Sequence, residues 1–154
     1  MMSKPKAYLM VGLPGSGKST WIKNSLPANI PVISRDIIRH KLGFTKSVDQ
    51  KAVLSKDKED TVTEYEMGMI HNYLAAGVDI VIDDINTGKY RKNMIQFLRD
   101  HGAEVVGVRM NTSLDTCIKR RDGQIDANVM RNISKRMIPL TEDEVDKVID
   151  VVGE

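Results

Sequence analysis

The sequence has little cysteine and no long apolar run. Its single cysteine, Cys117, excludes an internal disulfide, which agrees with a reduced, cytoplasmic setting. No stretch reaches the roughly 20 apolar residues of a membrane span, and the N-terminus lacks the apolar core of a signal peptide. We therefore expect a cytoplasmic protein with no membrane partner.

Neither the net charge nor the histidine positions indicate a function. The formal net charge is only +2, so composition does not announce nucleic-acid binding, although local patches matter more than the total. The histidines His40, His71 and His101 lie too far apart for a metal-binding motif. The 154 residues contain no repeat, and 41% of them are hydrophobic. We expect a single domain over residues 1–154.

What the sequence does contain is a phosphate-binding loop. Residues 12–19 read GLPGSGKS, which fits the P-loop pattern G-x-x-x-x-G-K-[ST]. The glycines let backbone N–H groups surround a phosphate, Lys18 can reach the β- and γ-phosphates, and the Ser19 hydroxyl can bind Mg²⁺. ATP and Mg²⁺ are therefore the expected cofactors. The loop residues expected to hold the nucleotide are Gly12, Pro14, Gly15, Ser16, Gly17, Lys18, Ser19 and Thr20.

Short apolar runs alternate with helical patterns along the chain. This alternation predicts an α/β fold, with a parallel sheet of about five strands and helices on both faces. The expected strands are 6–11, 31–34, 78–83, 104–110 and 147–152, although 142–149 could instead be helical. The expected helices are 20–26, 35–42, 60–76, 90–101, 113–121 and 126–137, with a loop or mobile lobe at 45–58.

Ligands of such folds bind beyond the carboxyl ends of the strands, which selects the polar segment after the second strand. Asp36 can orient an acceptor hydroxyl and take its proton, as phosphoryl transfer to an alcohol requires. Arg39, one helical turn further on, can hold an acceptor phosphate. The alternative interpretation makes Asp36 a helix cap and Arg39 a surface charge.

Two other segments fall at the same edge. Either Asp83 or Asp84 could lie near the Mg²⁺ or anchor Arg39, and Asn86 could bind substrate; the alternative is a polar strand end that caps the next helix. An arginine at the end of the helix 113–121 could close over the triphosphate, with Arg120 ahead of Arg121, or could merely favour the helix C-terminus.

Four stretches together resemble the kinase domain of phage polynucleotide 5′-kinase. They are GLPGSGKSTW at 12–21, SRDIIR at 34–39, VIDDIN at 81–86 and CIKRR at 117–121. The resemblance implies a P-loop kinase fold and transfer of the ATP γ-phosphate to a 5′-hydroxyl of single-stranded or end-exposed DNA or RNA.

Motif matching carries site roles over with that resemblance. It implies a phosphate contact for Lys18, a metal contact for Ser19, a general base at Asp36, and an acceptor phosphate contact for Arg39 with Asp84 near that arginine. For the lid, the resemblance implies an arginine in the segment from Lys119 to Arg121 without deciding which. We expect Arg120 to be the catalytic one and Arg121 to bind the nucleotide, and we expect Arg35 and Asn86 to contact the substrate. The chain departs from the pattern at Ile85, where the phage member has a small hydroxyl residue, and in the short segment after Arg121.

Three functions remain open from the sequence. The leading one is an ATP-dependent polynucleotide 5′-hydroxyl kinase. A small-molecule kinase of the same superfamily, with a sugar, antibiotic or sugar-nucleotide acceptor, shares the P-loop and the Asp after the second strand. A nucleotide-binding module without transfer activity is the third, and Asp36 argues against it because such a module needs no acceptor base.

Overall fold

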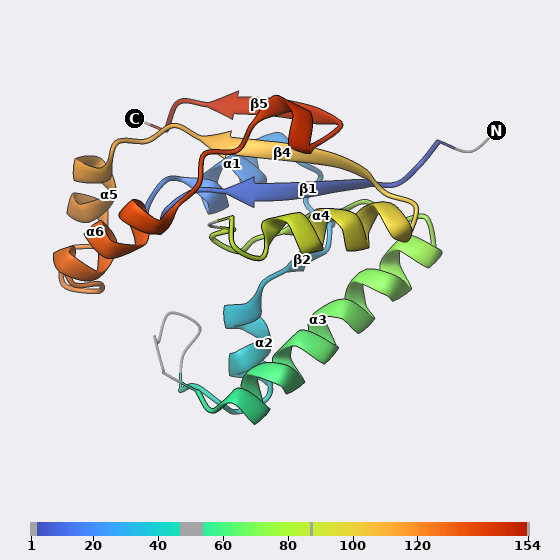
Figure 1. Cartoon of the computed structure of the whole chain (residues 1–154), viewed down its shortest axis with the longest axis horizontal. Helices are drawn as coiled ribbons and strands as arrows, with labels where there is room; N and C mark the ends of the chain where they lie inside the picture. The colour runs from blue at the N-terminus through green and yellow to red at the C-terminus, as the bar shows by residue number, and fades with distance from the viewer. Residues whose placement is uncertain (1–2, 47–53, 87, 154) are drawn as a thin grey trace.

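The computed structural model describes residues 3–46, 54–86 and 88–153 (Figure 1). They contain one sheet of five parallel strands in the order β2-β3-β1-β4-β5, which confirms the predicted architecture. The strands are β1 Lys6–Val11, β2 Val32–Ile33, β3 Ile80–Ile82, β4 Glu104–Met110 and β5 Lys147–Val151.

Helices connect the strands and cover both faces of the sheet. The α-helices are α1 Lys18–Ser25, α2 Arg35–Lys41, α3 Lys56–Ala75, α4 Arg91–Asp100, α5 Leu114–Arg120 and α6 Ala127–Arg136, and a 3-10 turn, η1, spans Glu142–Glu144. None of the helices within the described ranges has both the length and the apolar character that crossing a membrane requires.

Alternation along the central strand β1 explains the two covered faces. Ala7 and Leu9 belong to a large core cluster beneath α3 and α4, whereas Met10 belongs to a second cluster beneath α1. Successive side chains of a strand point to opposite faces, so one buried strand supplies both cores. The sheet is therefore apolar on both sides, as a parallel sheet between helices requires.

Element boundaries differ from the sequence predictions where local capping decides them. Helix α3 begins at Lys56 rather than residue 60, because the Ser55 hydroxyl accepts a hydrogen bond from the N–H of Lys58 at 3.3 Å. Much of the predicted loop at 45–58 lies outside the described residues, at 47–53. The helical alternative for 142–149 is wrong beyond residue 144, since β5 begins at Lys147.

The carboxyl ends of the strands meet at one edge of the sheet, toward the left of Figure 1. The P-loop follows β1 there, α2 follows β2, residues 83–86 follow β3, and the segment leading to α5 follows β4. The fold thus brings together the segments that the sequence singled out.

Candidate nucleotide and acceptor site

The P-loop curls between β1 and α1 as its composition predicts. Gly15 has φ +80° and Gly17 has φ +97°, a left-handed conformation that side-chain-bearing residues rarely adopt. Lys18 is the first residue of α1, and its ammonium donates to the carbonyl of Gly12 at 2.9 Å. Ser16, within the loop, is buried, and its carbonyl accepts a hydrogen bond from the Thr112 hydroxyl at 2.6 Å. The loop is therefore braced by the segment after β4.

The groups around Lys18 shift its pKa in opposite directions. Burial lowers the pKa of its ammonium, while the nearby carboxylates of Asp83 and Asp84 raise it and the charge of Arg121 lowers it again. The carboxylate of Asp36, in α2, also raises the pKa of Lys18. These influences place the P-loop lysine, the end of β3, the start of α2 and the end of α5 around one site.

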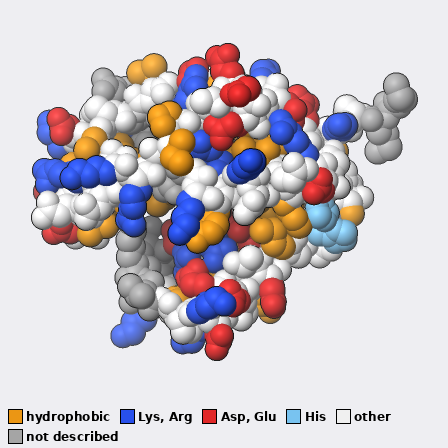
Figure 2. All heavy atoms as spheres, viewed as in Figure 1, with side chains coloured by type: hydrophobic (Ala, Val, Ile, Leu, Met, Phe, Trp, Pro, Cys, Tyr) orange, Lys and Arg blue, Asp and Glu red, His pale blue; other side chains and the backbone are white. Residues whose placement is uncertain are grey.

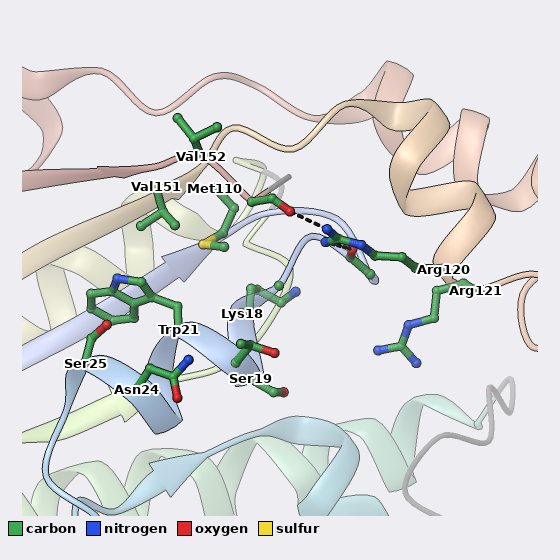
Figure 3. A pocket seen from close by; sticks show the side chains of 14 residues that line it. Lys18, Ser19, Trp21, Asn24, Ser25, Met110, Arg120, Arg121, Val151 and Val152 are labelled. Carbon is green, nitrogen blue, oxygen red and sulfur yellow. Dashed lines mark hydrogen bonds between the residues drawn. The ribbon is translucent and has the colours of Figure 1, made fainter.

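A cavity of about 600 Å³ opens on the P-loop. Figure 3 shows α1 on one side of it, with Trp21 and Asn24, and the end of β5 on the other, with Val151 and Val152. Gly15, Gly17, Lys18, Ser19 and Thr20 contribute the phosphate-facing part of the lining, and Arg120 and Arg121 close its far end. A cavity of this size suits a nucleotide whose phosphates rest on the loop.

The two arginines of α5 lie differently. The Arg120 guanidinium donates to the carbonyls of Gly15, at 3.1 Å, and Gly153, so it bridges the P-loop and the chain segment after β5. Arg121 donates to the Gln124 side chain at 3.1 Å, and Figure 3 shows its guanidinium beside the P-loop, separate from that of Arg120. Both arginines therefore border the phosphate site from the end of α5.

On the acceptor side, Asp36 is not a helix cap. Ser34 caps α2, since its hydroxyl accepts from the N–H of Ile37, and the Asp36 side chain is 61% exposed. Arg39 donates to Asp36 at 2.8 Å and grips Glu59 of α3 with two further bonds, at 2.9 and 3.0 Å. The structure thus gives Arg39 partners on two helices, which argues against a plain surface charge.

Arg35 faces α3 rather than open solvent. Its guanidinium donates to Glu59 at 2.8 Å, to Thr63 at 3.0 Å and to Glu66 at 3.4 Å. Its backbone N–H donates to the Asp84 carboxylate at 2.9 Å. The resemblance placed Asp84 near Arg39, but Asp84 instead fixes the first turn of α2, and Arg35 joins α2 to α3.

Asp84 and Glu66 form a carboxyl pair in which Glu66 is buried and Asp84 is partly buried. Burial raises the pKa of Asp84 well above its usual range, and the Glu66 carboxyl beside it raises it further. Glu66 is 2% exposed, and its Oε2 accepts no hydrogen bond from the described residues. A nearby carboxylate opposes the ionisation of Asp84, because two like charges at short distance repel each other.

Asn86 follows β3, and its side chain makes hydrogen bonds to the backbone. It has φ +55°, and its side-chain amide donates to the carbonyls of Met10, at 2.6 Å, and Asp84, at 3.1 Å. Asn86, which we expected to bind substrate, thus uses its side-chain amide to join the loop after β3 to the end of β1.

The residues present fit Mg²⁺ carried by a nucleotide. Ser19 offers an exposed hydroxyl at the first turn of α1, and Asp83 offers a carboxylate whose charge acts on Lys18. The described ranges contain no group of three or more His, Cys, Asp or Glu residues able to hold a metal by themselves. Magnesium that binds mostly to phosphates and water needs only one or two such protein ligands.

The sequence analysis did not identify Glu59, which holds both Arg35 and Arg39. The signal available for Glu59 was weak: Glu59, Thr63 and Glu66 recur at helical spacing, but the predicted helix began one residue after Glu59.

A glycine-rich loop between β1 and α1, at the carboxyl edge of a five-stranded parallel sheet, defines a P-loop protein with a kinase fold. Residues 8–142 match the family model described as an AAA domain, so the chain belongs to that family. A search of the curated proteins found no significant match.

Several solved structures share the P-loop kinase fold of this chain. A chain of the Pnkp1/Rnl/Hen1 RNA repair complex matches with a TM-score of 0.76 and 20% identity, over 89% of this chain and 45% of that one. The Mycobacterium tuberculosis APS kinase CysC, in complex with AMPPNP and APS, has a TM-score of 0.59 and 18% identity, over 97% and 90% of the two chains. A gluconokinase from Sinorhizobium meliloti 1021 has a TM-score of 0.57 and 17% identity, over 97% and 85%. The chain thus spans less than half of the length of the repair protein, and these likenesses concern the fold.

Proposed function

We propose that the protein transfers the γ-phosphate of ATP to the 5′-hydroxyl of DNA or RNA. The observation that carries this proposal is the position of Asp36. Its carboxylate is exposed, it lies at the same edge of the sheet as the P-loop, and its charge acts on both Lys18 and Asp83. An acceptor hydroxyl at Asp36 would therefore face the end of the bound triphosphate.

The residues supply a complete transfer step. As the acceptor oxygen bonds to the γ-phosphorus, its proton passes to a carboxylate oxygen of Asp36, and the bond from the γ-phosphorus to the β,γ-bridging oxygen breaks to release ADP. Lys18 and the P-loop N–H groups stabilise the negative charge on the phosphates. Mg²⁺, held by the nucleotide with Ser19 and Asp83, would neutralise further phosphate charge.

Arg39 supports a nucleic-acid acceptor. Three of its five N–H groups are used by Glu59 and Asp36 among the described residues, so two are left to bind a phosphate next to the acceptor hydroxyl. The bonds to Glu59 hold the guanidinium in one orientation, which lowers the entropy lost when a phosphate binds. Arg39 is in this way a ready-made phosphate contact one turn from the proposed base.

A small-molecule kinase is the second candidate, and one observation favours it. Glu59 and Asp36 neutralise the two arginines of the acceptor side, Arg35 and Arg39. Neutralised arginines attract a phosphate only weakly, so an acceptor without phosphate would lose little binding affinity at such a site.

Transfer from γ-labelled ATP tests the proposal. The protein is incubated with an oligonucleotide that carries a 5′-hydroxyl, with the same oligonucleotide already 5′-phosphorylated, and with gluconate and adenylyl sulfate. Labelling of the 5′-hydroxyl oligonucleotide alone is the expected result. Labelling of a small molecule alone contradicts the nucleic-acid acceptor, and nucleotide binding without any transfer contradicts the kinase.

A further inference from the structure

Two basic segments that are far apart in the sequence lie side by side at the carboxyl edge of the sheet. Residues 88–92 lead into α4, and residues 131–138 form the end of α6 and the turn after it; neither segment contains an acidic residue. Figure 2 shows lysine and arginine side chains gathered over α6 and the start of α4. The exposed members considered below are named the basic rim: Lys89, Tyr90, Lys92, Lys135 and Arg136.

A buried arginine fastens the two segments together. The Arg91 side chain is 1% exposed, and it donates to the carbonyls of Ile138, at 2.7 Å, and Pro139, at 3.2 Å. It also donates to the carbonyl of Asn86 at 3.1 Å and to both carboxylate oxygens of Glu144. The rim is thus rigidly placed, and it is continuous with the loop that ends β3 at the acceptor side.

The basic rim includes an aromatic ring, that of Tyr90, which is exposed and not part of the hydrophobic core. Tyr90 is 70% exposed, and the Lys89 ammonium lies 5.3 Å from its ring centroid. Lys135 and Arg136 stand on the neighbouring helix and line a shallow depression together with Asn132. A flat exposed ring among lysines and arginines is the combination that binds a single strand, because bases stack on the ring while cations contact the phosphates.

We propose that the basic rim binds the nucleotides that follow the acceptor nucleotide in a single-stranded DNA or RNA, with one base stacked on Tyr90. This proposal rests on the proposed function and extends it from a terminal nucleotide to a strand. Charge complementarity selects the partner, since the rim is positive while the net charge of the whole chain is only +2. The acceptor terminus enters at Asp36, and the rest of the strand continues over the rim.

Acceptor length separates the rim from the reaction site. The KM of a nucleoside 3′-phosphate is compared with that of an oligonucleotide of about ten nucleotides, a length within the range that single-strand sites cover. In Tyr90→Ala, the oligonucleotide KM should rise about tenfold, the order expected for one lost stacking contact, while the mononucleotide KM stays unchanged. Tyr90→Phe keeps the ring and should behave as wild type. Tyr65→Ala on α3, which removes a tyrosine that is 54% exposed, is the matched control.

The cations are tested in the same way. Lys135→Ala should weaken oligonucleotide binding and reduce the slope of log K against log salt by about one phosphate contact. Lys147→Ala at the start of β5, at the opposite end of the sheet, should change neither. Binding of a labelled oligonucleotide, followed by fluorescence anisotropy, gives the same comparison without phosphate transfer.

The outcomes distinguish the two proposals. Loss of oligonucleotide affinity in Tyr90→Ala but not in Tyr65→Ala supports the rim, whichever acceptor is phosphorylated. An unchanged oligonucleotide affinity, or an equal loss for mononucleotide and oligonucleotide, overturns the rim and leaves the kinase proposal standing. A wild-type protein that binds the oligonucleotide through Tyr90 but phosphorylates no 5′-hydroxyl overturns the kinase proposal alone.

Discussion

Replacing Arg91 by Met should destabilise the protein more than any single substitution on its surface. The guanidinium is fully buried and makes five hydrogen bonds, to three carbonyls and to the Glu144 carboxylate. Removing one member of a buried ion pair costs about 3–5 kcal/mol, because the remaining polar groups lose their partner. Water can reach Glu144 and the exposed residues Ile138 and Pro139, so the lower part of that range is expected.

Thermal and urea unfolding followed by circular dichroism measure this loss. For a chain of this length, about 3 kcal/mol corresponds to a fall in Tm of roughly 10 °C. Arg99→Met is the matched control, since Arg99 is exposed and, within the described part of the chain, its side chain makes one bond, to Asp146 at 3.3 Å. Such a pair is expected to contribute less than about 1 kcal/mol. If Arg91→Met and Arg99→Met lose the same stability, the reasoning about the buried hub is refuted.

Three further predictions concern the site. Asp36→Asn should lower kcat about a hundredfold or more and leave the ATP Kd unchanged, since a general base acts on the transition state; near wild-type turnover would move the base elsewhere. Because the folded-state pKa of Asp84 is raised, the stability due to this group is complete below its unfolded pKa and is lost as pH rises through the folded pKa. Glu66→Gln should flatten this fall and raise the unfolding free energy at pH 8, and an unchanged pH profile would contradict the carboxyl pair. Because the Arg120 guanidinium is held by the carbonyls of Gly15 and Gly153, we expect the two arginines to exchange the roles given in the sequence analysis. Arg121→Ala should then lower kcat more than it weakens ATP binding, whereas Arg120→Ala should mainly raise the ATP Kd; the reverse pattern, in steady-state kinetics and nucleotide titrations, would contradict this exchange.

The sequence determined the features that depend on neighbours along the chain. The P-loop could be read from residues 12–19, because a phosphate nest needs glycines and a lysine at fixed local spacing. The strand at 104–110 and the helix capped by Ser113 followed from an apolar run and a local hydrogen bond, and the structure confirms both. The parallel sheet followed from the alternation of such segments.

Only the tertiary structure decided which side chains meet. Glu59 binds Arg39 from a helix 20 residues further on, and Arg91 reaches residues 138 and 144 across 47 and 53 positions. Asp84 pairs with Glu66 and with the start of α2, a partnership that two adjacent aspartates at a strand end leave undecided. These contacts arise when α3 folds onto α2 and when the turn after α6 packs against the start of α4. No local pattern encodes such packing, because each partner is an ordinary charged residue until folding removes it from water.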